Sequence, residues 1–148
     1  MELVRIKPPK YAYAYLSAAT VAHWAWADGW ARWKYPWLGL AAGSAGLFLM
    51  FSAASLFKKK NTAIVPTEES SALVLEGPYR WTRNPMYLGI LLILMGIALA
   101  VGTPPFYAVP VVFFLTIRFV FIPFEEAKLE RKFGQAYLDF KRRVRRWM

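Results

Sequence analysis

The fold of this chain is decided by the stretch PWLGLAAGSAGLFLMFSAASLF, which runs from Pro36 to Phe57 without a charged residue. A membrane crossing needs about 20 helical residues, so this stretch is long enough to span a bilayer. Three further stretches, residues 11–30, 85–101 and 105–124, are largely apolar, and none shows the alternation of a membrane β-strand. The sequence therefore predicts an all-α polytopic membrane protein with four transmembrane helices.

The composition favours the same class. The 148 residues are 57% apolar, and 19 Lys and Arg against 9 Asp and Glu give a net charge of +10. Soluble domains are less apolar, and nucleic-acid binding would account for the charge but not for the apolar surplus. The absence of cysteine excludes a secreted disulfide scaffold, and the many aromatic residues exclude disorder. The length predicts one domain, residues 1–148.

The positions of Lys and Arg predict the orientation in the membrane. Most of them lie in the amino terminus, in the loop 58–84 and in the tail after Phe124, whereas Arg32 and Lys34 lie in the first of the other two loops. Lys and Arg are enriched on the cytoplasmic side of membrane proteins. We therefore expect an integral protein of the cytoplasmic (inner) membrane, with both termini and the loop 58–84 in the cytoplasm.

The tail is predicted to form a further helix, residues 125–146. Apolar residues recur there at steps of three and four, which places them on one helical face, and most of the basic residues fall elsewhere. Such an amphipathic helix lies along the anionic surface of a membrane. The apolar face consists of Leu129, Phe133, Tyr137, Phe140, Val144 and Trp147.

A motif at the start of the third apolar stretch, GPYRWTRNPMYLG from Gly77 to Gly89, indicates a binding site. Asn84 is a favourable N-cap residue, and Pro85 suits the first helical position. The positive end of the helix dipole then lies at the cytoplasmic surface beside Arg80 and Arg83, and such an end binds anions. The alternative is an ordinary capped helix with interfacial arginine and aromatic anchors.

Glu125 and Glu126, at the end of the fourth stretch, are a second candidate feature. Carboxylates at membrane depth are costly and usually functional. Arg118 precedes them by seven and eight residues, spacings that return to nearly the same helical face. Together with the helix N-terminus, these charges predict a pocket for a zwitterionic ligand. Alternatively, the acids only complement a helix dipole and Arg118 only extends its charge to the interface.

Other residues favour structural roles. His23 is the only histidine in a chain without cysteine, so a buried polar role is favoured over metal binding and no metal site is predicted. Gly39 and Gly43 form a small-xxx-small pattern, which usually indicates close helix packing.

The motif Gly77–Gly89, followed by EEAKLERKFGQAY from Glu125 to Tyr137, resembles the membrane methyltransferase family of isoprenylcysteine carboxyl methyltransferases and phospholipid N-methyltransferases. The resemblance covers the chain from Lys58 onward. It implies S-adenosylmethionine as methyl donor on the cytoplasmic side and a lipophilic acceptor that arrives from the bilayer. The residues that it implies for the donor site are Tyr79, Arg80, Arg83, Asn84, Pro85, Tyr87, Gly89, Glu125 and Glu126.

The expected reaction is methyl transfer to a membrane lipid, most simply a phospholipid amine, because the basic cytoplasmic rim suits a phosphate. Glu126 is the hypothetical base that removes the proton of the amine. Arg118, or Arg80, is expected to bind the phosphate or carboxylate of the acceptor. Isoprenylcysteine enzymes usually have His where Asn84 stands, which disfavours a prenyl-cysteine acceptor.

Other functions remain open at the level of sequence. The acceptor is alternatively a carboxylate or a thiol, as in an isoprenylcysteine-type enzyme. A non-catalytic membrane binding or assembly protein would keep the same fold. A third alternative is an NADPH-dependent reductase, because membrane sterol reductases resemble the family in their C-terminal architecture. Neither nucleic acid nor a metal ion is an expected partner.

Overall fold

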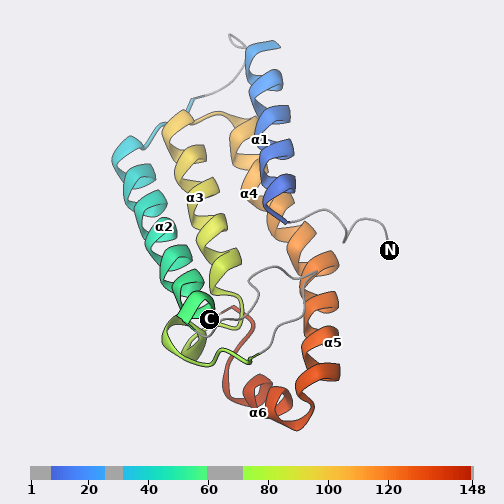
Figure 1. Ribbon diagram of the computed structural model, residues 1–148. Coiled ribbons are helices and arrows are strands. Elements are labelled where there is room, and N and C mark those ends of the chain that lie inside the picture. The colour runs from blue at the N-terminus through green and yellow to red at the C-terminus, as the bar shows by residue number, and fades with distance from the viewer. Residues whose placement is uncertain (1–7, 26–31, 60–71, 148) are drawn as a thin grey trace.

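The computed structural model describes residues 8–25, 32–59 and 72–147, and these ranges contain helices and no β-strand (Figure 1). The predicted all-α class is confirmed for this part of the chain. Residues 26–30 of the first predicted span and 60–71 of the cytoplasmic loop lie outside it. The helices are α1 (Pro8–Ala25), α2 (Pro36–Lys59), the 3₁₀ turn η2 (Gly77–Arg80), α3 (Pro85–Val101), α4 (Pro104–Thr116), the π-helical turn η3 (Ile117–Phe121), α5 (Ile122–Phe133) and α6 (Gln135–Arg143).

Two helical segments are long and apolar enough to cross a membrane. They are α2 and the continuous helix Pro104–Phe133, which combines α4, η3 and α5. α3 is equally apolar but shorter, with 17 residues, and it begins and ends where the sequence predicts. It ends at Gly102, whose φ of 75° suits a residue without a side chain. These segments support association with a membrane.

α2 and α3 pack along paired glycines. Gly39 lies opposite Gly96, and Gly46 lies opposite Gly89, so that a Cβ at Gly39 or Gly46 would lie 2.6 or 2.5 Å from the facing carbonyl oxygen. Backbones approach this closely only where side chains are missing. The predicted packing role is confirmed for Gly39 and Gly43, since a Cβ at Gly96 would lie 2.8 Å from the backbone nitrogen of Gly43. A Cβ at Gly43 itself would meet nothing within 4 Å.

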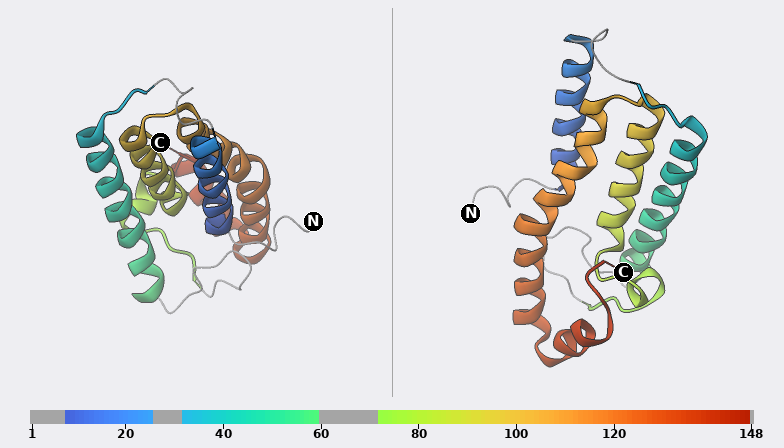
Figure 2. Two further views of the ribbon diagram at one scale, coloured as in Figure 1. Left: turned by 90° about the horizontal axis from the view of Figure 1, so that it is seen from above. Right: turned by 180° about the vertical axis from the view of Figure 1, so that it is seen from behind.

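α3 lies between α2 and α4, and α1 packs on α4 (Figures 1 and 2). One buried apolar cluster joins α1, α3 and α4. It includes Leu94 and Ala98 of α3 with Phe113 of α4 and Ile117 of η3, each at most 2% exposed. Large apolar side chains on the outside of the bundle, such as Phe48 of α2, are exposed, as on a helix that faces lipid.

The predicted single tail helix 125–146 is wrong. α5 continues the line of α4 beyond the bundle, and α6 then folds back toward the end of α2 (Figures 1 and 2). The break lies at Gly134, whose φ of 51° is readily adopted by glycine and rarely by other residues. α6 ends at Arg143, after which Val144 is extended, with φ −122° and ψ 130°.

The apolar face of the tail is buried against the protein itself. Tyr137, Phe140 and Val144 form a cluster with Ala53 of α2 and with Tyr79 of η2. Each of these side chains is at most 8% exposed. The expectation that this face lies on the membrane is therefore corrected, because its partner is the chain's own loop. The packing fixes the tail at the end of the bundle where α3 begins.

Candidate functional site

α3 begins at the motif singled out in the sequence. Pro85 is its buried first residue, and the backbone carbonyl of Asn84 accepts the first helical hydrogen bond, from Leu88 at 3.0 Å. The predicted side-chain cap is wrong, because the Asn84 side chain makes no bond to the helix. Its Nδ2 instead donates to the backbone carbonyl of Arg146 at 2.9 Å. The amide therefore ties the start of α3 to the C-terminal end of the described chain.

The turn before α3 buries one predicted site residue and exposes another. Tyr79 is 7% exposed, with its ring edge-on to Phe57 at a centroid distance of 5.7 Å. Burial, and then the negative charge of Glu125, raise the pKa of the Tyr79 phenol above its ordinary value. The phenol therefore stays protonated. Arg80, at the end of η2, is exposed.

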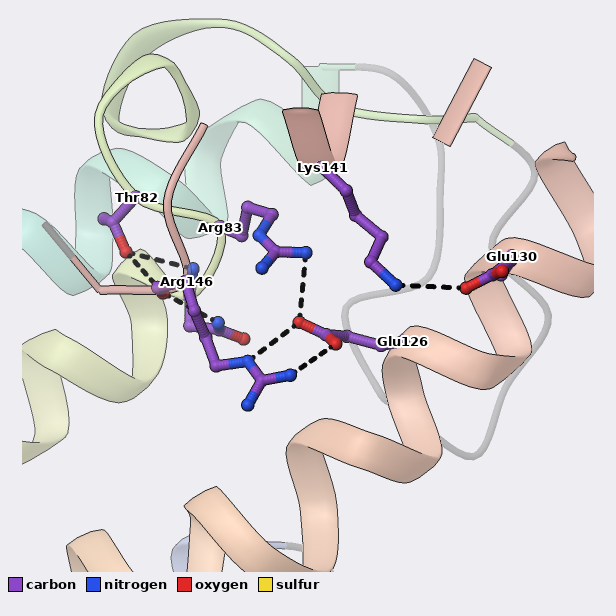
Figure 3. Close-up of polar contacts among 7 residues, drawn as sticks. Thr82, Arg83, Glu126, Glu130, Lys141 and Arg146 are labelled. Atoms are coloured by element: carbon purple, nitrogen blue, oxygen red, sulfur yellow. Dashed lines mark hydrogen bonds and ion pairs between the residues drawn. The ribbon is translucent and has the colours of Figure 1, made fainter. Parts of the chain in front are cut away.

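Glu126 lies at the centre of a charged cluster (Figure 3). Arg146 donates to both of its carboxylate oxygens, from Nε at 3.1 Å and from Nη2 at 2.7 Å. Arg83, from the motif before α3, places Nη1 at 3.1 Å from Oε1. Three segments that are distant in the sequence thus meet at one carboxylate that is 8% exposed. Two guanidinium groups and one carboxylate leave the cluster with a net positive charge.

Arg83 has a hydrogen-bond donor that is not used within the described part of the chain. Its side chain is 11% exposed, and its buried Nε has no hydrogen-bond partner among the described residues. Tyr137 lies nearby. Burial, and then Glu126, raise the pKa of the Tyr137 phenol to about 12, although Arg83 lowers it. A buried donor without a partner is costly, so such a group is commonly one that a ligand satisfies. The cluster therefore suits an anionic ligand group.

Glu125 contacts α3 directly. The hydroxyl of Tyr87 donates to Oε1 of Glu125, and Tyr87 is itself 8% exposed. Both acids of the predicted pair therefore meet the motif at the start of α3: Glu125 through Tyr87, and Glu126 through Arg83. The arrangement presents carboxylates and guanidinium groups together, as a zwitterionic ligand requires.

The sequence did not place at the site the residues that follow α6, Val144–Trp147, here called the C-terminal segment. The carbonyl of Arg146 accepts a hydrogen bond from Thr82 Oγ1 at 3.0 Å, and the ring of Trp147 lies 5.1 Å from that of Phe114 in α4. The residues of this segment continue the helical periodicity of the tail. No local pattern therefore distinguishes Arg146 from its basic neighbours, and only the extended backbone after α6 sets it apart.

Two predicted site residues have different surroundings. Arg118 lies in η3 with its guanidinium carbon 5.6 Å from the centre of the Phe119 ring. A π turn takes up an extra residue, so the regular α-helical spacing that was used to relate Arg118 to the acidic pair does not hold through this segment. In the described part of the chain, the ion pairs of Glu126 go to other arginines. Gly89 lies against Gly46 of α2, where helix packing accounts for its missing side chain.

A cavity of about 300 Å³ lies where α1 and α3 end and α4 begins. Figure 1 shows that this end of the bundle is opposite to the end where α3 begins. There Nδ1 of His23 lies 3.4 Å from Oγ1 of Thr103, which is fully buried. The histidine was expected to be a buried polar residue; it makes a polar contact but is only half-buried. Within the described ranges, no three His, Cys, Asp or Glu residues are grouped as metal ligands. The cavity is lined by His23, Arg32, Lys34, Ala100, Val101 and Thr103.

Comparison with known proteins gives the site its context. The phospholipid methyltransferase family matches residues 35–136, a range that includes both the motif before α3 and the acidic pair. An uncharacterized protein of Haemophilus influenzae is 41% identical over 63 residues, which are 43% of this chain and all of that protein. No solved structure matches. Because the family match covers more than half of the residues, the chain belongs to the phospholipid methyltransferase family.

Proposed function

We propose that this chain is an integral membrane methyltransferase that moves a methyl group from S-adenosylmethionine to a phospholipid amine. Membership of the phospholipid methyltransferase family supports methyl transfer. The observation that carries the proposal is the 3.1 Å ion pair between Arg83 and Glu126. It joins the two sequence motifs that define the resemblance, one before α3 and one in α5, into a single site.

The residues present fit the methyl donor. S-adenosylmethionine carries a carboxylate, an ammonium group and ribose hydroxyls. The buried Nε of Arg83 and the net positive charge of its cluster suit the carboxylate. Glu125 is bonded to a hydroxyl and not to a guanidinium, so its carboxylate remains for the acceptor amine. The proposed donor site is lined by Tyr79, Arg83, Asn84, Pro85, Tyr87, Glu125 and Glu126.

When bound, S-adenosylmethionine supplies a methyl group on a positively charged sulfur. The protein's contribution is to align the acceptor nitrogen with that methyl and to exclude water. The acceptor amine must also lose a proton. We assign this proton to Glu125 rather than Glu126, because Glu126 is neutralised by two guanidinium groups whereas Glu125 meets the uncharged hydroxyl of Tyr87.

We further propose a single membrane domain with four spans, α1, α2, α3 and the helix from α4 onward. The two segments long enough to cross a bilayer support it, as does the concentration of Lys and Arg at the end that carries the candidate site. In this topology the donor site faces the cytoplasm. A lipid amine reaches it from the bilayer, and its phosphate lies at the basic rim of the tail.

The test uses purified full-length protein in detergent micelles. We expect isothermal titration calorimetry to detect binding of S-adenosylhomocysteine, and we expect radiolabelled S-adenosylmethionine to label an amine-containing lipid of a membrane extract. Glu125→Gln should abolish labelling, while Glu130→Gln, a half-exposed acid on the same helix, should retain it. Absence of S-adenosylhomocysteine binding would overturn the proposal, and binding of NADPH instead would identify a reductase.

A further inference from the structure

Arg146 joins the two halves of the proposed donor site. Its backbone carbonyl accepts hydrogen bonds from Thr82 Oγ1 and Asn84 Nδ2, at 3.0 and 2.9 Å, before the start of α3. Its guanidinium binds both oxygens of Glu126 on α5. One residue thus spans from the helix start to the acidic pair (Figure 3).

The C-terminal segment holds Arg146 in place from both sides. Val144 is buried in the cluster of Tyr79 and Tyr137, and Trp147 packs on Phe114 of α4. The anchored neighbours fix the backbone at Arg146, so mainly the freedom of the side chain is lost when the ion pair forms. The fold therefore places the backbone of Arg146 within reach of Glu126.

The pairing with Glu126 is a two-point contact. Paired N–H···O bonds between a guanidinium and a carboxylate fix the plane of the carboxylate as well as its distance. The hydrogen bonds to Glu126 also raise the pKa of the Arg146 guanidinium, so the guanidinium stays charged. Glu126 has one rigid orientation as long as Arg146 is present, whereas Arg83 contacts a single oxygen.

We infer that Arg146 is a positioning residue of the methyl-donor site: its guanidinium fixes the carboxylate of Glu126, its carbonyl fixes the amide of Asn84, and the C-terminal segment forms one wall of the site. The inference rests on the proposed function. Arg146 acts through Glu126 and is assigned no contact with the donor or the acceptor.

The first measurement is the dissociation constant of S-adenosylhomocysteine, determined by calorimetry on the full-length protein. We expect Arg146→Gln to weaken binding about tenfold or more, the scale of one lost charge-assisted contact. Arg142→Gln is the matched control, since it removes the same charge from the same tail at a side chain that is 75% exposed. It should bind as the wild type does.

A double-mutant cycle tests whether Arg146 acts through Glu126. Glu126→Gln alone should weaken binding, and Arg146→Gln should have no further effect in that background. Losses that multiply in the double variant would overturn the inference, since they would mean that Arg146 acts independently of Glu126. Arg146→Lys keeps the positive charge but loses the two-point contact that a guanidinium makes with a carboxylate. Its affinity for S-adenosylhomocysteine should fall between those of the wild type and Arg146→Gln.

The outcomes separate this inference from the proposed function. A wild-type protein that does not bind S-adenosylhomocysteine overturns the proposed function. A wild type that binds it, with Arg146→Gln and Arg146→Lys indistinguishable from it, overturns the positioning role alone. If Arg146→Gln does not fold, the Lys variant decides the question, because full affinity in that variant would also overturn the positioning role.

Discussion

Arg146 binds both carboxylate oxygens of Glu126 although twenty residues separate them in the sequence. Glu126 lies in α5, and Arg146 follows α6, which runs back after the break at Gly134. The ion pair therefore exists only because the tail folds back on itself. Folding of α6 onto the loop before α3 and formation of the charged cluster are consequently one structural event.

The first prediction concerns the stability contributed by this cluster. Glu126→Gln leaves Arg83 and Arg146 without their carboxylate, and Arg83 is buried. We expect unfolding in denaturant to become easier by about 2–4 kcal/mol, because an uncompensated buried charge is costly. Equilibrium unfolding in micelles, followed by Trp fluorescence, measures the change.

Glu130→Gln is the control for this experiment, one helical turn further along α5. Its pair with Lys141 has the same 3.1 Å separation, but the two side chains are 44% and 32% exposed. Exposed pairs contribute about 0–1 kcal/mol. Equal effects of the two substitutions would contradict the assignment of Glu126 as the centre of a buried cluster.

A second prediction concerns the hydrogen bond between Tyr87 and Glu125. Tyr87→Phe keeps the buried ring and removes only the hydroxyl that contacts Glu125. We expect methyl transfer to fall about tenfold, the effect of one hydrogen bond to a charged group, and the free energy of unfolding to fall by about 1–3 kcal/mol, because the carboxylate of Glu125 loses its partner. Tyr107→Phe is the matched control, because its hydroxyl bonds Trp33 at the other end of the bundle. Unchanged transfer in Tyr87→Phe would show that the hydroxyl does not position Glu125.

The sequence predicted those parts of the site that have local signals. Pro85 after a polar residue gives the start of α3, and the apolar run gives its length. The meeting of Glu125 and Glu126 with the start of α3 was predicted from the charges and the helix N-terminus at one membrane depth, and the family resemblance also implied it. The structure gives these contacts through Tyr87 and Arg83, residues that belong to that motif.

The features of the site that the sequence did not predict depend on tertiary structure. The periodicity of the tail continues to Trp147, so Arg146 could not be separated from the basic residues around it. The spacing of Arg118 assumes a regular α-helix, and the π turn η3 changes the phase. Asn84 was expected to cap α3, but its amide instead bonds a carbonyl 62 residues away. No local sequence pattern contains such a partner.

A third prediction tests the packing of α2 on α3. A Cβ at Gly89 would lie 2.8 Å from the carbonyl oxygen of Gly46, so Gly89→Ala should destabilise the fold by about 1–3 kcal/mol. Gly43→Ala meets nothing within 4 Å and should be neutral or slightly stabilising, since alanine is the better helix former. Thermal unfolding in micelles compares the two. A neutral Gly89→Ala would mean that the glycine is kept for another reason, such as contact with a ligand.

The last prediction concerns the break between α5 and α6. Gly134 combines φ 51° with ψ −125°, the mirror image of an extended conformation, which side chains disfavour. A Cβ there would meet nothing within 4 Å, so the effect of Gly134→Ala is that of the backbone alone, about 1–3 kcal/mol of strain. Because the fold-back brings Arg146 to Glu126, we expect the variant to lose stability and also to bind S-adenosylhomocysteine more weakly. Gln135→Ala, which removes only an exposed contact to Asp139, should change neither quantity by much. A stable Gly134→Ala variant with full affinity would show that the reversal of the chain does not depend on this backbone conformation.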